Sequence, residues 1–265
     1  MQQASDFREE SLTLKSLIAD LDDSAFEQTT QFKSWTINDV FRHLHFWNKA
    51  VMVATEGDEA FAVFFEDVGA HMMKGGSLPE YEKAYLDGLS GGALREAWAS
   101  LVEETADAYA ALDPSSRVPW AGPSMSARSA ISARQMETWA HGQEVFDVLG
   151  ADREEHDRIR NIVVLGINTF GWTFKVRGET PPDPMPFVSL VSPSGEVWTY
   201  GESQQSNFIQ GDAVEFARVV TQTRNIGDTS LHVVGDPASD WMSKAQCFAG
   251  RANQPPEKGS RFKAG

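Results

Sequence analysis

The stretch Arg134-Gln-Met-Glu-Thr-Trp-Ala-His-Gly-Gln-Glu-Val-Phe-Asp147 decides how this chain is interpreted. It contains Glu137 and His141 in an E-x-x-x-H spacing. In a helix, a spacing of four residues places both side chains on one face, roughly 6 Å apart. A carboxylate and an imidazole at that separation can share a divalent cation. The stretch therefore predicts two ligands of a metal site on one helix, and it requires a third donor from elsewhere.

The best candidate for the third donor is His43, in the stretch Asp39-Val-Phe-Arg-His-Leu-His-Phe-Trp47. Thr36-Ile-Asn-Asp39 is a variant of the capping box and predicts the start of a helix that runs to about Ala54. His43 falls on the apolar face of this helix, whereas His45 falls on another face. Two histidines and one glutamate on inward faces of one bundle predict a three-ligand site with open positions.

The residues alone also allow an interpretation without a metal. His43 could be a core histidine that bonds a backbone carbonyl. Glu137 could form an ion pair with Arg134, one turn earlier on the helix. His141 could lie on the helix surface. Spacing does not decide between a metal site and these separate structural roles.

Composition and charge limit the partners. The chain has 265 residues and a formal net charge of −15, which argues against a nucleic acid or an anionic membrane as partner. The single cysteine, Cys247, cannot form an intrachain disulfide, and this fits a reducing compartment. There is no signal-peptide pattern and no apolar run of membrane-spanning length. We therefore expect a cytoplasmic protein.

The order of predicted elements indicates an α+β fold in two parts. Residues 1–150 are predicted to form a bundle with four main helices, with shorter helical segments between the second and the third. Residues 151–265 are predicted to form a small α+β domain, which begins with one helix over residues 152–176 and a linker over residues 178–184. The strands expected after the linker include a hairpin around Ser192-Pro-Ser-Gly195.

Two motifs carry a resemblance to a known family. Ser34-Trp-Thr-Ile-Asn-Asp-Val-Phe-Arg-His43-Leu and Met136-Glu-Thr-Trp-Ala-His141-Gly-Gln resemble the mycothiol-dependent maleylpyruvate isomerase family, part of the wider DinB-like group of metal-binding four-helix bundles. That family has a W-x-x-x-D-x-x-x-H-L motif, which Trp35, Asp39, His43 and Leu44 match. Its E-x-x-x-H motif is matched by Glu137 and His141. The segment 120–141 is most similar to an uncharacterised branch of the family.

The resemblance implies a thiol-cofactor-dependent isomerase or transferase. His43, Glu137 and His141 would bind a divalent metal, with zinc expected and nickel or iron as alternatives, and the metal would activate a low-molecular-weight thiol. Arg224, at the end of a helix in the second domain, would help to bind a small, acidic substrate. The expected pocket walls beside the cofactor are Trp120, Met125 and Trp139.

Two other functions stay open at this point, so it is not decided whether the protein is an enzyme. One is a binding module that holds a metal or ligand without catalysis. The other is a metal-dependent hydrolase, in which the metal activates water. The sequence does not identify the substrate or the oligomeric state.

Overall fold

The computed structural model describes all residues from 1 to 265, and the chain divides into two compact units, Met1–Gly150 and Ala151–Gly265. The first unit is helical apart from one short pair of strands, and the second combines helices with a four-stranded sheet. The α+β fold class predicted from the sequence is confirmed. No helix combines the length and the apolar character that crossing a membrane requires.

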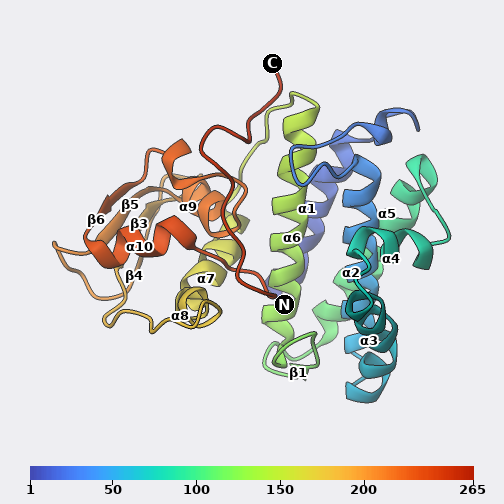
Figure 1. The fold of residues 1–265 in the computed structure, drawn as a ribbon, viewed down its shortest axis with the longest axis horizontal. Helices are drawn as coiled ribbons and strands as arrows, with labels where there is room; N and C mark the ends of the chain where they lie inside the picture. Colours follow the sequence, from blue (N-terminus) through green and yellow to red (C-terminus); the bar gives the residue numbers. More distant parts are fainter. The chain divides into compact units, whose positions relative to one another are not determined.

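Four long helices form the first unit: α1 (Gln2–Leu17), α2 (Ile37–Ala54), α5 (Gly91–Ala111) and α6 (Ala127–Val148). Both α1 and α2 pack against α5 and against α6, and this pattern defines a four-helix bundle (Figure 1). Two further helices, α3 (Asp58–Met73) and the short α4 (Leu78–Tyr85), pack against α2. A 3-10 turn (Ala25–Glu27) precedes α2, and the paired strands β1 (Arg117–Val118) and β2 (Met125–Ser126) precede α6.

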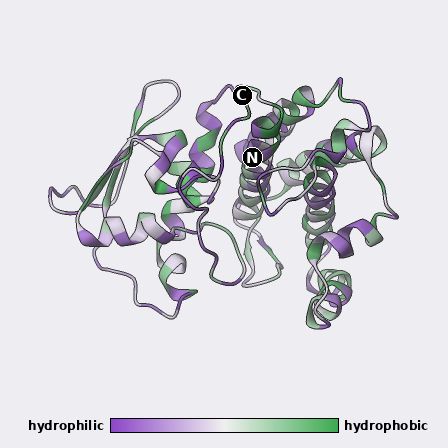
Figure 2. Ribbon diagram, turned by 45° about the horizontal axis from the view of Figure 1, so that its top comes forward, coloured by the Kyte–Doolittle hydropathy of each residue, from purple (hydrophilic) through white to green (hydrophobic).

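The local sequence explains why α2 begins where it does. Thr36 and Asp39 form a complete capping box, in which the Thr36 hydroxyl accepts from the Asp39 N–H and the Asp39 carboxylate accepts from the Thr36 N–H. Hydrophobic and hydrophilic residues are interspersed along the helices of the bundle (Figure 2). The apolar stripe of α2 reaches the core, where Phe41 meets Trp98 of α5 edge to face at 4.9 Å.

The second unit contains a mixed sheet in the order β4-β3-β5-β6. Its strands are β3 (Phe187–Val191), β4 (Val197–Tyr200), β5 (Phe208–Asp212) and β6 (His232–Val234). Strands β3 and β5 run parallel, whereas β4 and β6 are antiparallel to their neighbours. The helices of this unit are α7 (Arg160–Asn168), α8 (Phe170–Lys175), α9 (Ala213–Val220) and α10 (Asp236–Lys244). Residues 178–186 contain no helix or strand, and they include the linker predicted over residues 178–184.

The single helix predicted over residues 152–176 is wrong. Residues 151–156 are irregular, a 3-10 turn covers Asp157–Ile159, and α7 and α8 are separate short helices. The charged residues at the start of this segment are used elsewhere. Asp157 accepts hydrogen bonds from the backbone N–H and the hydroxyl of Ser194, at 3.0 and 2.6 Å, in the turn between β3 and β4. Asp157 therefore anchors a hairpin and does not begin a long helix.

Candidate metal centre

His43, Glu137 and His141 converge at one point inside the helical bundle. His43 comes from α2, and the other two come from α6. One donor atom from each residue lies within 4.8 Å of the others. The Oε2 atom of Glu137 is 3.2 Å from Nε2 of His141 and 3.7 Å from Nε2 of His43. Donors bound to one tetrahedral zinc ion at about 2.1 Å are roughly 3.4 Å apart, so this cluster has the dimensions of a metal site.

Helix geometry and packing bring the three groups together. The i,i+4 spacing places Glu137 and His141 on one face of α6, as expected. Helices α2 and α6 pack against each other, so the inner face of α2 presents His43 to that pair. The three side chains are only 10%, 25% and 12% exposed, in chain order. The site is therefore largely shielded from water, and Glu137 is its most accessible member.

Glu82 is a further member of the site, and sequence reasoning missed it. Its Oε1 atom lies 2.8 Å from Nδ1 of His43 and accepts a hydrogen bond from the indole N–H of Trp47 at 3.1 Å. Glu82 is fully buried, although it belongs to the short helix α4. The stretch Pro79–Tyr85 has acidic residues at positions 80 and 82, and nothing in the spacing distinguishes the buried one from the solvated one. No sequence signal identified Glu82.

Aromatic rings enclose the two histidines. Trp35 stacks on His141 with 5.6 Å between the centroids, and it also meets His43 edge-on at 5.2 Å. Phe32 contacts His141 edge to face at 5.0 Å. Trp35 is the first residue of the W-x-x-x-D-x-x-x-H-L motif. Its position shows that this tryptophan forms a wall of the site, whereas Asp39 of the same motif caps α2.

The charges in the site determine its protonation in the metal-free protein. Burial lowers the pKa of His43, but the carboxylates of Glu82 and Glu137 outweigh this effect and raise the pKa to about 9. Burial opposes ionisation of Glu137, yet hydrogen bonds from His141 and His43 hold its pKa well below the usual range. The pKa of His141 is lowered, first by burial and then by the neighbouring charge of His43. One proton is therefore held mainly by His43, between two carboxylates.

The interpretations without a metal do not describe this geometry. Arg134 forms no ion pair with Glu137, because its Nε donates to the Asn48 side chain at 3.0 Å and its Nη2 to the Leu44 carbonyl at 3.4 Å. The partners of His43 are carboxylates and not a backbone carbonyl. His141 does not lie on the surface. His45 is buried away from the cluster, and its pKa is lowered to about 4, chiefly by burial.

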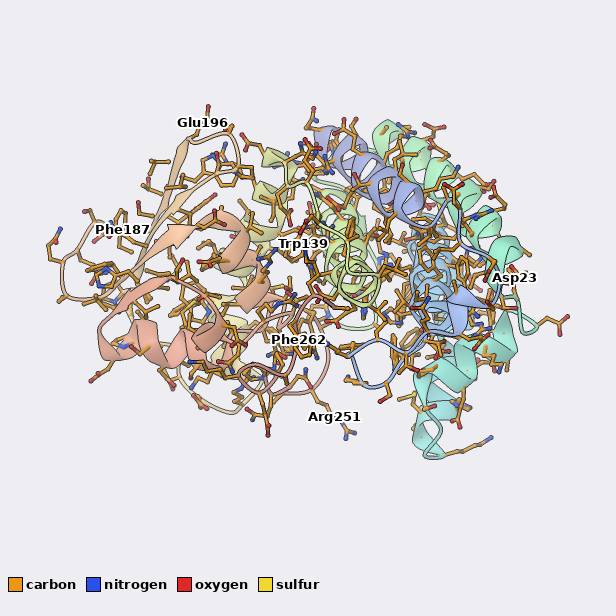
Figure 3. The ribbon with its side chains drawn as sticks, turned by 90° about the horizontal axis from the view of Figure 1, so that it is seen from above. Asp23, Trp139, Phe187, Glu196, Arg251 and Phe262 are labelled. Carbon is orange, nitrogen blue, oxygen red and sulfur yellow. The ribbon has the colours of Figure 1, made fainter.

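The three predicted pocket residues lie in different places. Trp120 packs against Trp47, with 5.4 Å between the ring centroids. Met125 lies in β2, opposite Val118 of β1. Trp139 is fully buried on α6, where Figure 3 labels it. Because it follows Glu137 by two residues, its side chain leaves the helix about 200° further round, so Trp139 is not brought to the metal ligands.

An open pocket of about 490 Å³ is lined in part by Trp120, which packs on Trp47. The rings of Phe61, Phe65 and Trp120 lie on one side, and Trp47 connects them to His43 through ring contacts of 5.4 and 6.1 Å. The residues that line the pocket are Asp58, Phe61, Ala62, Phe65, Glu66, Trp120, Ala121 and Gly122. The pocket is therefore lined by three aromatic rings and two acidic side chains, and it has no basic side chain.

Arg224 lies in the second unit, four residues beyond the end of α9. Its side chain is half-buried, and Nη1 donates to the Thr223 carbonyl at 2.9 Å. These local contacts do not test its predicted role in binding substrate, which stays a prediction.

The donor set fits a divalent metal. Two imidazole nitrogens and one carboxylate oxygen are a common set for zinc, and they also bind nickel and iron. Glu82 supplies the carboxylate that often supports a ligating histidine from behind. The class of protein is therefore a helical bundle with a candidate metal site, followed by a small α+β unit.

Comparison with known proteins identifies the family. The chain belongs to the family described by the mycothiol maleylpyruvate isomerase N-terminal domain, whose model matches residues 7–146. Two relatives are uncharacterized proteins from two strains of Mycobacterium tuberculosis. Each is 32% identical over 254 residues, which cover 96% of this chain and 96% of the relative.

Solved structures share the fold. A crystal structure of the mycothiol-dependent maleylpyruvate isomerase aligns with a TM-score of 0.53 and 17% identity, over 82% of this chain and 87% of that chain. A crystal structure of a histidine-to-alanine mutant of that isomerase gives a TM-score of 0.52 and 18% identity with the same coverage. The predicted family resemblance is thus confirmed.

Proposed function

We propose that this protein binds one divalent metal ion through His43, Glu137 and His141 and uses it in thiol-dependent chemistry on a small molecule, as an isomerase or transferase. The observation that carries the proposal is the convergence of the three donor atoms within 4.8 Å. Membership of the family adds the thiol, because a solved relative is a mycothiol-dependent isomerase. Zinc is the metal that this donor set favours.

Each residue of the site has a separate task in this proposal. A divalent cation at these three ligands would lower the pKa of a bound thiol and so provide a thiolate near neutral pH. His43 and His141 offer their Nε2 atoms, and Glu137 offers a negative charge that balances part of the cation. Trp35 and Phe32 exclude water from the histidine rings. The chain needs no nucleophilic cysteine, and Cys247 is buried.

The pocket beside Trp120 would hold an apolar part of the thiol or of the substrate. Its wall of Phe61, Phe65 and Trp120 offers ring faces, and Trp47 links this wall to His43. Asp58 and Glu66, which also line the pocket, would repel a carboxylate. An acidic group of the substrate therefore has to be bound elsewhere.

Arg224 is our candidate for binding that acidic group, because a guanidinium can hold a carboxylate through two hydrogen bonds. The Arg224→Gln protein should bind metal like the wild type but show a higher KM for an acidic substrate, with Arg224→Lys in between. Steady-state kinetics with maleylpyruvate and mycothiol would measure this. An unchanged KM in both variants would remove Arg224 from the site.

The thiol is tested by calorimetry. Mycothiol should bind the zinc-loaded protein and release about one proton per site near neutral pH, which titrations in two buffers of different ionisation enthalpy would report. The metal-free protein and the Glu137→Gln protein serve as controls and should bind no thiol. Failure of mycothiol, glutathione and bacillithiol to bind the zinc-loaded protein would reject the thiol-dependent enzyme and favour a metal hydrolase or a non-catalytic binding module.

A further inference from the structure

Glu82 makes an unusual set of contacts for a buried carboxylate. A single oxygen, Oε1, is shared by two donors from α2, Nδ1 of His43 at 2.8 Å and Nε1 of Trp47 at 3.1 Å. These donors are four residues apart, so they lie on one face of α2. The other oxygen, Oε2, is buried without a hydrogen-bond partner. The carboxylate is therefore directed at the histidine from the side opposite to Glu137.

The support behind Glu82 is rigid. Helix α4 starts at a complete capping box between Ser77 and Glu80, with a proline in its first turn. It packs against α2, the helix that carries His43. Glu82 follows this capped turn, and its side chain is fully buried. The position of its carboxylate is thus fixed by backbone structure, as a supporting group behind a ligand has to be.

We propose that Glu82 is a positioning residue that controls metal binding through His43. The inference rests on the metal site proposed above. By accepting from Nδ1, Glu82 keeps the proton on that nitrogen, so that a metal displaces the proton on Nε2 and finds its lone pair directed to Glu137 and His141. Its negative charge also makes Nε2 a stronger donor. The indole N–H of Trp47 donates to the same oxygen and so helps to orient the carboxylate toward the imidazole of His43.

A purely structural role explains the contacts less well. Burying a carboxylate costs several kcal/mol unless its oxygens are well paired, and Oε2 has no partner. A leucine would join α4 to α2 without a buried charge, but it would leave the Nδ1–H of His43 and the indole N–H of Trp47 without an acceptor. What glutamate supplies at this position is an acceptor for Nδ1 of His43 together with a negative charge beside the imidazole.

The test compares Glu82→Gln and Glu82→Leu with the wild type. Glutamine keeps an acceptor for Nδ1 but removes the charge, whereas leucine removes both. We expect zinc affinity to fall about tenfold in the first variant and about 100-fold in the second, measured by competition with a chelator. At saturating cobalt, the visible absorption spectrum should also change, because the orientation of the His43 ligand changes. Trp47→Phe, which removes the N–H donor and part of the ring but keeps the Glu82 carboxylate, should show a smaller loss than Glu82→Leu.

Asp87→Asn is the matched control. It removes a carboxylate just after α4, at an exposed position with a φ of 51° that asparagine tolerates. Its zinc affinity should stay within about twofold of the wild type, since it lacks contact with the ligands. If Glu82→Leu does not fold, Glu82→Gln decides the question.

The outcomes separate this inference from the proposed function. Zinc affinity and a cobalt spectrum equal to the wild type in both Glu82 variants, with altered unfolding of the metal-free protein only, would overturn the positioning role and leave the metal site intact. Absence of metal binding by the wild type itself would reject the proposed function, and the role of Glu82 with it.

Discussion

The indole of Trp35 lies parallel to the imidazole of His141, with 5° between the two planes and 5.6 Å between the centroids. Phe32 meets the same imidazole edge-on, and the ring of His43 lies 4.8 Å away. The rotation of His141 is therefore fixed by packing on several sides, and its Nε2 is held toward Glu137. The ligands are prearranged before any metal arrives, which reduces the ordering cost of binding.

The assignment of the three proposed metal ligands can be tested by substitution. His43→Ala and His141→Ala should each lower zinc affinity more than about 100-fold, because loss of a direct ligand exceeds the effect of a supporting residue. Elemental analysis and chelator competition would measure this. His45→Gln is the control, since His45 lies on the same helix but on another face, and it should retain about one zinc per chain. Equal losses in all three variants would contradict the assigned ligand set.

The pH dependence of metal binding should reflect a proton on His43. Its pKa of about 9 in the metal-free protein means that a metal has to displace this proton at neutral pH. Zinc affinity should therefore rise up to about tenfold per pH unit from pH 7 and level off near pH 9. Histidine resonances in NMR spectra of the metal-free protein would locate the titration. A constant affinity between pH 7 and 9 would contradict this protonation state.

The raised pKa of His43 affects the stability of the metal-free protein in the opposite direction. The folded pKa of His43 lies above its unfolded value of about 6.5, so its contribution to stability is complete below pH 6.5. That contribution is lost as the pH rises through 9. We expect the metal-free protein to become less stable over this range while its metal affinity increases, and urea unfolding at several pH values would record the loss.

His45 should make the bundle sensitive to acid. Burial and the positive charge of Lys49 lower its pKa to about 4, so the folded state resists protonation while the unfolded chain accepts a proton below about pH 6.5. Stability should fall between pH 6.5 and 4, by up to about 3 kcal/mol from this residue. In His45→Gln the fall should be smaller over the same range. Identical pH slopes for both proteins would show that other groups cause the acid sensitivity.

The capping box of α2 should contribute to stability without setting metal affinity. Thr36→Ala removes the hydroxyl that accepts from the Asp39 N–H, and it should lower the free energy of unfolding by about 1 kcal/mol. The α2 backbone around His43, two turns further on, should keep its position. Thr13→Ala is a suitable control, because that hydroxyl is exposed and donates to the Glu9 carbonyl within α1, away from the start of α2. A large loss of zinc affinity in Thr36→Ala would show that the helix start and the ligand are coupled.

Local patterns were sufficient to predict the bundle and its cluster of donors. The E-x-x-x-H spacing and the capping box at Thr36 each depend on residues within one helical turn, and the structure places both as expected. The split between a helical first part and a mixed second part also followed from changes in periodicity. Such features depend on short-range geometry, which a sequence specifies well.

Features that depend on distant contacts were not predictable. Glu82 is buried only because α4 packs on α2, and its partner His43 lies 39 residues earlier in the chain. Asp157 accepts a hydrogen bond from the backbone N–H of Ser194, 37 residues later, and the long helix predicted around it does not form. In each case tertiary structure determines what local sequence leaves undetermined.

The separation of the ligands along the chain has a consequence for biosynthesis. His43 leaves the ribosome more than ninety residues before Glu137 and His141, at a translation rate of roughly 5–20 residues per second. For several seconds the nascent chain carries only the first of the three donors, His43, together with the Glu82 carboxylate. In the proposed function, metal loading would thus be a late event that follows the docking of α6 onto α2. A cell short of metal would then accumulate the folded, metal-free protein. The stability of that metal-free state would determine how long the protein persists before it binds an ion.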